Sequence, residues 1–124
     1  MKPKLTVFIA EDSPNVRDNL KRVISKTNNL RTIGEADNID DAIKYFDKLL
    51  PAVVIIDIGL TNSSGIDLLK HIKTRNYQAK TIVFTNYVSP PYKIICEKLK
   101  TDYFLDKTKD FDKLVEILNN YPSS

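Results

Sequence analysis

The chain has 124 residues, of which 42% are hydrophobic and 28% are charged, a composition typical of one compact globular domain. Its 19 Lys and Arg residues are interleaved with 16 Asp and Glu residues, which gives a net charge of +3 without a continuous run of basic residues. Solvated helix faces explain this pattern, and we expect no direct nucleic acid binding. No apolar stretch approaches the roughly 18 residues of a membrane span, and we expect no signal peptide because the first apolar run is too short. We therefore expect a cytoplasmic protein with no membrane contact.

Cys96 is the only cysteine and His71 is the only histidine. A single cysteine can form neither an internal disulfide nor a cysteine-based zinc site. Ser-His and Cys-His catalysis would both require His71, which has no sequence neighbours that would orient it. We therefore expect His71 to be a surface or core-edge residue and not a general base.

Five short apolar runs predict strands. In chain order they span residues 5–10, 30–36, 53–56, 81–85 and 103–105. The run 53–56 is apolar without alternation, as expected of a strand that is buried on both faces of a parallel sheet. This third strand is therefore predicted to lie in the centre of the sheet.

A segment of helical period follows each predicted strand. The apolar positions that define these helices span, in chain order, residues 16–24, 39–50, 66–72, 95–99 and 111–118. Ser13 and Pro14 suit the cap and the first turn of the first helix. Five strand–helix repeats imply an α/β fold with a doubly wound five-stranded parallel sheet. Such sheets adopt more than one strand order, and we expect the order 2-1-3-4-5 of the flavodoxin-like (βα)5 type. We expect a single domain over residues 1–124, with its core at about 4–120.

Polar side chains stand at the ends of four of the five predicted strands. Glu11 and Asp12 follow the first strand, Asp57 follows the third, Thr85 ends the fourth and Lys107 follows the fifth. Because the carboxyl ends of parallel strands open onto one rim, these side chains are expected to share a cleft. Each acidic residue alone could be a helix cap or a turn former, but the coincidence of all five favours a functional site.

These residue types suit phosphoryl transfer. Neighbouring carboxylates repel one another, and a hard divalent cation such as Mg²⁺ (or Mn²⁺) removes the conflict. With Asp12 and Asp57 as ligands and Glu11 acting through water, one Asp57 oxygen stays free to attack phosphorus in line. The Lys107 ammonium and the Thr85 hydroxyl can stabilise the charge on the transferring group. The sequence therefore predicts a phosphoacceptor aspartate beside a metal site.

Four segments carry a family resemblance, and their order and spacing are its most specific feature. Residues 9–13 contain an acidic pair, and residues 53–60 with Gly65 contain the strand and loop around Asp57. Residues 83–85 form the end of a strand that closes on a threonine, and residues 102–107 contain an aromatic residue followed by a lysine. Together they resemble the receiver domains of two-component response regulators over nearly the whole chain, and the stand-alone chemotaxis receiver in particular.

The resemblance implies a signalling phosphoacceptor and not an enzyme, with self-phosphorylation and self-dephosphorylation as its only reactions. A sensor histidine kinase or a histidine phosphotransfer protein would phosphorylate Asp57. The Gly59 backbone carbonyl would complete the metal shell. Phe104 would rotate inward when Thr85 moves toward the phosphoryl group.

The resemblance also implies that a downstream protein partner reads the face built from the fourth and fifth strands with the helices after them. The residues beyond the last helix in this sequence are too few for an effector domain, so output comes either from protein contact or from a domain outside this sequence. We expect the stand-alone type, as a monomer or a phosphorylation-dependent dimer. Tyr87, Tyr92 and Tyr103 fall around this face and are interface candidates. Tyr87 is also a candidate to shield the phosphoryl group from water.

Three positions depart from the family pattern, which often has proline at positions 61 and 108 and a small residue at position 86. Thr61, Asn86 and Thr108 stand there, so the sequence predicts neither the usual loop geometry nor the usual cis Lys-Pro bond.

Residues 57–61 also partly resemble the D-x-D-x-T motif of haloacid-dehalogenase-like phosphohydrolases, but Gly59 occupies the position of their acid and base. That hydrolase and a phosphorylation-independent pseudo-receiver remain the alternatives.

Overall fold

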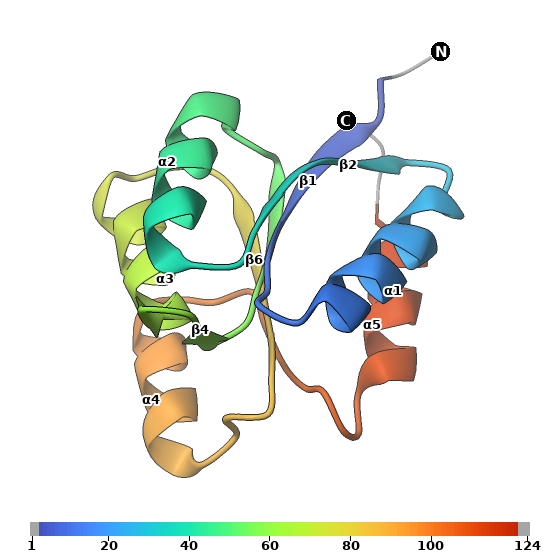
Figure 1. The fold of residues 1–124 in the computed structure, drawn as a ribbon. Coiled ribbons are helices and arrows are strands. Elements are labelled where there is room, and N and C mark those ends of the chain that lie inside the picture. Colours follow the sequence, from blue (N-terminus) through green and yellow to red (C-terminus); the bar gives the residue numbers. More distant parts are fainter. Residues whose placement is uncertain (1–2, 122–124) are drawn as a thin grey trace.

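A computed structural model describes residues 3–121 (Figure 1). Five strands form one parallel sheet: β1 (Leu5–Ala10), β2 (Leu30–Ala36), β3 (Val53–Ile56), β6 (Lys80–Thr85) and β7 (Tyr103–Asp106). Their order is β2-β1-β3-β6-β7, which is the predicted arrangement of the five sheet strands. No helix within the described residues is both long and apolar enough to cross a membrane.

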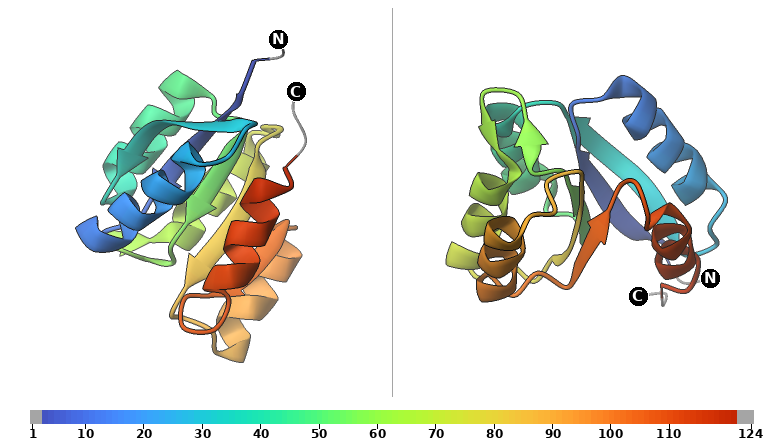
Figure 2. Two further views of the ribbon diagram at one scale, coloured as in Figure 1. Left: turned by 90° about the vertical axis from the view of Figure 1, so that its right-hand side faces the viewer. Right: turned by 90° about the horizontal axis from the view of Figure 1, so that it is seen from below.

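Helices cover both faces of this sheet. They are α1 (Pro14–Ser25), α2 (Ile39–Leu49), α3 (Gly65–Thr74), α4 (Pro90–Lys98) and α5 (Phe111–Asn119). Figures 1 and 2 show α1 and α5 on one face and α2, α3 and α4 on the other. Ser13 caps α1 as predicted, because its Oγ accepts a hydrogen bond from the Val16 amide at 3.3 Å, and Pro14 begins the helix.

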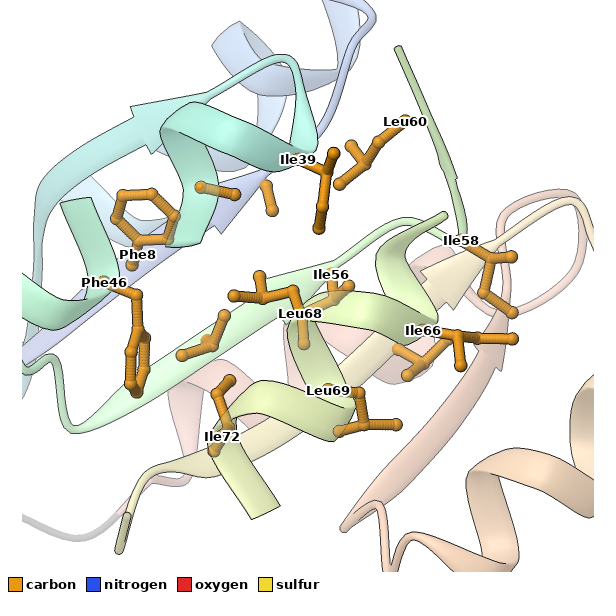
Figure 3. Close-up of a cluster of buried hydrophobic side chains, with 14 of the residues drawn as sticks. Phe8, Ile39, Phe46, Ile56, Ile58, Leu60, Ile66, Leu68, Leu69 and Ile72 are labelled. Atoms are coloured by element: carbon orange, nitrogen blue, oxygen red, sulfur yellow. The ribbon is translucent and has the colours of Figure 1, made fainter. Parts of the chain in front are cut away.

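The sheet separates two apolar cores, which follow from the alternation of side chains along each strand. On β1, Val7 and Ile9 belong to the core under α1 and α5, whereas Phe8 belongs to the core under α2 and α3. Figure 3 shows the second core, which gathers Phe8 of β1, Phe46 of α2 and Ile72 of α3. All four residues of β3 are at most 2% exposed, so the third strand is central, as its unbroken apolar run predicts.

A small hairpin between β3 and α3 was not predicted. It pairs β4 (Gly59–Leu60) with β5 (Ser63–Ser64) in antiparallel fashion, and Asn62 takes the turn with φ 76°. The Thr61 amide donates to the Asp37 carbonyl at 3.3 Å, a bond that proline at this position could not make. Strands of two residues carry no periodicity, so the sequence indicated only a loop here.

Candidate functional site

The five predicted polar residues meet at one rim of the sheet. Asp57 follows β3, and its amide donates to the Ala10 carbonyl at 2.9 Å, which continues the pairing of β3 with β1. Glu11, Asp57 and Thr85 are buried, whereas Asp12 is exposed at the mouth of the site. The structure therefore brings these five side chains together at one rim of the sheet.

Asp57 is held through both carboxylate oxygens. Its Oδ1 accepts hydrogen bonds from the Thr85 hydroxyl at 2.7 Å and from the Gly59 amide at 3.1 Å. Its Oδ2 accepts from Lys107 Nζ, also at 2.7 Å. The carboxylate is thus oriented by a hydroxyl, a backbone N–H and an ammonium, which are groups that stabilise negative charge.

Lys107 also joins Asp57 to a second buried carboxylate. Its Nζ lies 2.7 Å from Glu11 Oε1, while Glu11 Oε2 accepts from the Ser13 amide at 3.0 Å. Burial raises the pKa of Glu11 to about 7, against the lowering effect of its bonds from Lys107 and Ser13. Burial alone would lower the pKa of Lys107, but hydrogen bonds and charges from Asp57 and Glu11 outweigh it and raise this pKa.

The acidic cluster fits a divalent cation. Glu11, Asp12 and Asp57 each place one oxygen so that all three lie within 4.8 Å of one another. Lys107 pairs with two of these carboxylates, Glu11 and Asp57, so its single positive charge leaves an excess of negative charge in the cluster when all three are ionised. Carboxylate oxygens are the ligands that Mg²⁺ prefers. The donor set and its charge therefore match the predicted cofactor.

Two glycines allow close packing around Asp57. A Cβ atom at Gly65, the first residue of α3, would overlap the Asp57 carbonyl oxygen. A Cβ atom at Gly59 would lie 2.5 Å from Cε2 of Tyr87, so the tyrosine ring occupies the place of a side chain there. The sequence had marked Gly65 only as part of the loop, and no local pattern indicates either contact.

The predicted tyrosines do not form one surface. The Tyr87 and Tyr92 rings meet edge to face at 5.4 Å, and both border a cavity of about 310 Å³ beside Asp12 and Gly59. Tyr103 instead borders a cavity of about 620 Å³ together with Ile117 of α5. Tyr103 precedes Phe104, and neighbouring side chains on a strand point to opposite faces of the sheet.

Phe104 lies on the same side of the sheet as the core beneath α4. It is half-buried and pairs in register with Val83, two residues before Thr85. Beside it lies a cavity of about 360 Å³ that Cys96 and Thr101 also line. Phe104, to which the family resemblance assigns the role of switch aromatic, therefore lies on the strand next to Thr85, opposite the residue two positions before it.

The structure adds a residue that the sequence had not indicated. Arg17 of α1 donates from Nη1 to the Glu11 carbonyl at 2.8 Å, and its Nε lies 3.6 Å from a Glu35 oxygen. This bond holds the backbone that carries the acidic pair. An arginine on a helix is ordinarily a solvated charge, so sequence alone gives no signal for this role.

His71 lies outside the site, on the seam between α2 and α3. Its Nε2 lies 2.7 Å from Asp47 Oδ1, and its Nδ1 lies 2.7 Å from Arg75 Nη1. The ring also packs edge-on against Phe46 of the core. This placement agrees with the expected core-edge role.

Residues 7–119 match the family described as the response regulator receiver domain. The chain belongs to this family. Receiver domains are signalling phosphoacceptors and not classical enzymes, and the fold and the family both confirm the resemblance seen in the sequence. No match favours the hydrolase or the pseudo-receiver alternative.

The Lys107–Thr108 peptide bond is trans, as are all peptide bonds in the described part of the receiver domain.

Curated relatives share this domain as part of longer chains. The sensory transduction protein LytT of Bacillus anthracis is 29% identical over 117 residues, which cover 94% of this chain and 47% of the relative. The nitrate/nitrite response regulator protein NarL of Escherichia coli is 22% identical over 114 residues, covering 92% of this chain and 53% of the relative. The receiver chain thus spans about half the length of these relatives.

Solved receiver structures superpose closely on it. A LuxR-family DNA-binding response regulator from Staphylococcus aureus is 27% identical with a TM-score of 0.85, and the match covers 94% of this chain and 99% of that one. The signal receiver domain of the NarL response regulator from Mycobacterium tuberculosis reaches a TM-score of 0.81 at 18% identity, with 96% and 99% coverage. At that identity the second likeness shows the fold alone.

Proposed function

We propose that Asp57 is the phosphoacceptor of this receiver domain, and that a sensor histidine kinase or a histidine phosphotransfer protein supplies the phosphoryl group. The observation that carries this proposal is the paired contact of the Asp57 carboxylate with Thr85 and Lys107, each at 2.7 Å. A carboxylate held by these two donors at the rim of the sheet is placed for nucleophilic attack on phosphorus.

In the proposed step, an Asp57 oxygen bonds to phosphorus while the phosphorus–nitrogen bond of phosphohistidine breaks. The electron pair of that bond stays on the imidazole nitrogen, and Asp57 becomes an acyl phosphate. The Lys107 ammonium and the Thr85 hydroxyl can then donate hydrogen bonds to the negative phosphoryl oxygens, which stabilises the transferring group. Burial of Asp57 strengthens both interactions, because little water competes for the donors.

The proposed cofactor is Mg²⁺ (or Mn²⁺), held by Asp12 and Asp57 directly, by Glu11 through water and by the Gly59 carbonyl. Both Glu11 oxygens and both Asp57 oxygens accept hydrogen bonds, so a cation would share these two buried carboxylates with their donors, whereas Asp12 is exposed at the mouth of the site. A bound divalent cation supplies positive charge that neutralises the transferring phosphoryl group.

The proposed output is a change of the face formed by β6, α4, β7 and α5, which a downstream protein partner reads. The Thr85 hydroxyl would follow the phosphoryl group, and Phe104 would move inward behind it. Tyr92 and Tyr103 are partner-contact candidates on the two sides of β7. We expect no direct DNA contact by this domain, a monomer or a phosphorylation-dependent dimer, and a cytoplasmic location typical of response regulators.

Intact-mass measurement tests the phosphoacceptor. Purified protein with Mg²⁺ and either a phosphohistidine donor or a small acyl phosphate should gain one phosphoryl group, and Asp57→Asn should gain none. Omission of the divalent cation should abolish most of the labelling. Equal labelling of wild type and Asp57→Asn would overturn the assignment, and steady turnover of a generic phosphatase substrate would favour the hydrolase.

A further inference from the structure

The loop between β7 and α5 carries Lys107. The Lys107 amide donates to the Thr85 carbonyl at 3.0 Å, while its Nζ lies 2.7 Å from an oxygen of Asp57 and 2.7 Å from an oxygen of Glu11. A lysine side chain is a flexible four-carbon stem, so the place of its ammonium depends on the backbone from which the stem starts. The conformation of this loop therefore helps to set where the ammonium lies.

Asp106 and Asp110 lock the loop by hydrogen bonds in both directions. The Asp106 amide donates to Asp110 Oδ2 at 2.8 Å, and the Asp110 amide donates to the Asp106 carbonyl at 2.8 Å. Asp106 Oδ1 accepts from the Thr108 amide at 2.8 Å, and the Asp106 carbonyl also accepts from the Lys109 amide at 3.3 Å. Every amide of residues 106–110 thus has an acceptor, and two of these acceptors are side-chain carboxylates.

Asp110 does not use its carboxylate in the way that is usual for its position. An aspartate directly before a helix ordinarily accepts from an amide of the first helical turn. Among the described residues, no amide of the first turn of α5 donates to the Asp110 carboxylate, which accepts from Asp106 instead. A proline at position 108, which the family pattern often has, could not donate as the Thr108 amide does. The two carboxylate bonds are therefore a feature of this chain's own loop.

We propose that Asp110 is a positioning residue for Lys107, which locks the loop so that the ammonium stays against Asp57 and Glu11. The inference rests on the proposed role of Lys107 in phosphorylation of Asp57. Without the lock, the ammonium spends less time against the two carboxylates. Phosphorylation then slows, because the donor is out of place when charge develops on the phosphoryl group. Binding of Mg²⁺ becomes tighter, because the ammonium repels the cation and competes with it for the same oxygens.

These two effects have opposite signs, which separates positioning from general damage to the site. Asp110→Ala removes the acceptor of the Asp106 amide and should slow phosphorylation of Asp57 roughly tenfold. The same variant should bind Mg²⁺ roughly threefold more tightly. Asp110→Asn keeps an oxygen that can accept from Asp106, so both quantities should stay within about twofold of the wild-type values.

Asp112→Ala is the matched control. It removes the same charge from the start of α5, but Asp112 is exposed and has no hydrogen bond or ion pair within residues 3–121. Both its rate of phosphorylation and its affinity for Mg²⁺ should equal those of the wild type.

Lys107→Ala is the reference for a lost ammonium. It should show slower phosphorylation and tighter Mg²⁺ binding, each to a larger extent than Asp110→Ala. If Asp110 acts only through Lys107, adding Asp110→Ala to Lys107→Ala should change neither quantity further.

The experiment measures binding of Mg²⁺ alone by isothermal titration calorimetry. The initial rate of labelling by a small acyl phosphate at saturating Mg²⁺ is measured by intact mass. Far-UV circular dichroism identifies the folded variants. If Asp110→Ala does not fold, Asp110→Glu, which moves the carboxylate by one methylene, takes its place in the comparison.

Three results would overturn the positioning role of Asp110. They are wild-type values of both quantities in Asp110→Ala, weaker Mg²⁺ binding together with slower labelling in that variant, and a further loss of rate in the double variant. If the wild type gains no phosphoryl group on Asp57, the phosphoacceptor proposal fails. The Mg²⁺ affinities of Asp110→Ala and Lys107→Ala then still decide whether Asp110 positions the ammonium.

Discussion

Glu11 shares Lys107 with Asp57, because Glu11 Oε1 lies 2.7 Å from the same Nζ that contacts Asp57 Oδ2 at 2.7 Å. One ammonium therefore serves two buried carboxylates. Burial raises the pKa of Glu11, whereas Lys107 and the Ser13 amide favour its charged form. Without a bound cation, burial favours protonated Glu11 while Lys107 and Ser13 favour ionised Glu11. The stability of the fold therefore depends on pH.

The first prediction concerns the pH dependence of the metal-free protein. The pKa of Glu11 rises from its ordinary 4.5 to about 7 on folding, so between these values the folded state binds more protons than the unfolded state. Stability then falls as the pH rises through this window, by about 1 to 3 kcal/mol from this one group. Urea unfolding in a chelator, at a series of pH values, measures the effect.

Glu11→Gln is the comparison variant, since its side chain does not titrate and its amide oxygen can still accept from Lys107. Its NH2 group cannot accept from the Ser13 amide, so the pH slopes are compared and not the absolute stabilities. The free energy of unfolding of this variant should lack the Glu11 part of the decline between pH 4.5 and 7. Saturating Mg²⁺ should flatten the wild-type curve, because a cation favours the charged carboxylate. Superimposable pH profiles for wild type and Glu11→Gln in the chelator would contradict the prediction.

The second prediction concerns Thr85. Thr85→Ala should still be phosphorylated on Asp57, because Lys107 and Gly59 keep their bonds to the carboxylate. It should lose most of the phosphorylation-induced change around Phe104 and α4, since the hydroxyl supplies the contact that differs between the two states. Amide chemical shifts with and without phosphoryl group measure this change.

Thr85→Ser is the control for this prediction because it keeps the hydroxyl. It should retain most of the response. If phosphorylated Thr85→Ala showed the full wild-type shift changes, the hydroxyl would not be the coupling group, and another contact of Asp57 would have to carry the signal.

The third prediction concerns the start of α3. Gly65→Ala should lower the free energy of unfolding by about 1 to 3 kcal/mol, because its Cβ would overlap the Asp57 carbonyl oxygen, which is backbone and cannot turn away. It should also slow phosphorylation, since relief of the overlap must move Asp57. Chemical denaturation and intact-mass labelling measure the two effects.

Gly34→Ala offers a comparison at a second crowded glycine. Its Cβ would lie 2.7 Å from Cδ1 of Leu49, the end of an exposed side chain that can rotate aside, and 3.1 Å from Cδ1 of the buried Phe8 ring, which would have to shift by only a few tenths of an ångström. We expect a smaller loss of stability there and normal phosphorylation of Asp57. A Gly65→Ala variant as stable and as readily labelled as Gly34→Ala would refute the close approach of α3 to the site.

The sequence by itself determined the alternation of strands and helices, the central place of the third strand and the polar residues at the strand ends. The repeats alone leave the strand order open, because doubly wound sheets adopt more than one order. Strands buried on both faces read as unbroken apolar runs, and the carboxyl ends of parallel strands must meet at one edge, so Glu11, Asp57 and Lys107 could be brought together without coordinates. These features depend on the periodicity of apolar residues and on the order of strands and helices, and both can be read from the sequence. They needed no knowledge of any loop path.

Only the tertiary structure decided how the loops close around that rim. The contact between Gly59 and Tyr87, the bond from Arg17 to the Glu11 carbonyl and the separation of Tyr103 from Tyr87 all depend on backbone paths between distant residues. Short polar segments such as the hairpin at 59–64 have no periodicity that would set their course. Their geometry follows from the packing of the whole fold, because neighbouring loops fill whatever space the sheet and helices leave to them.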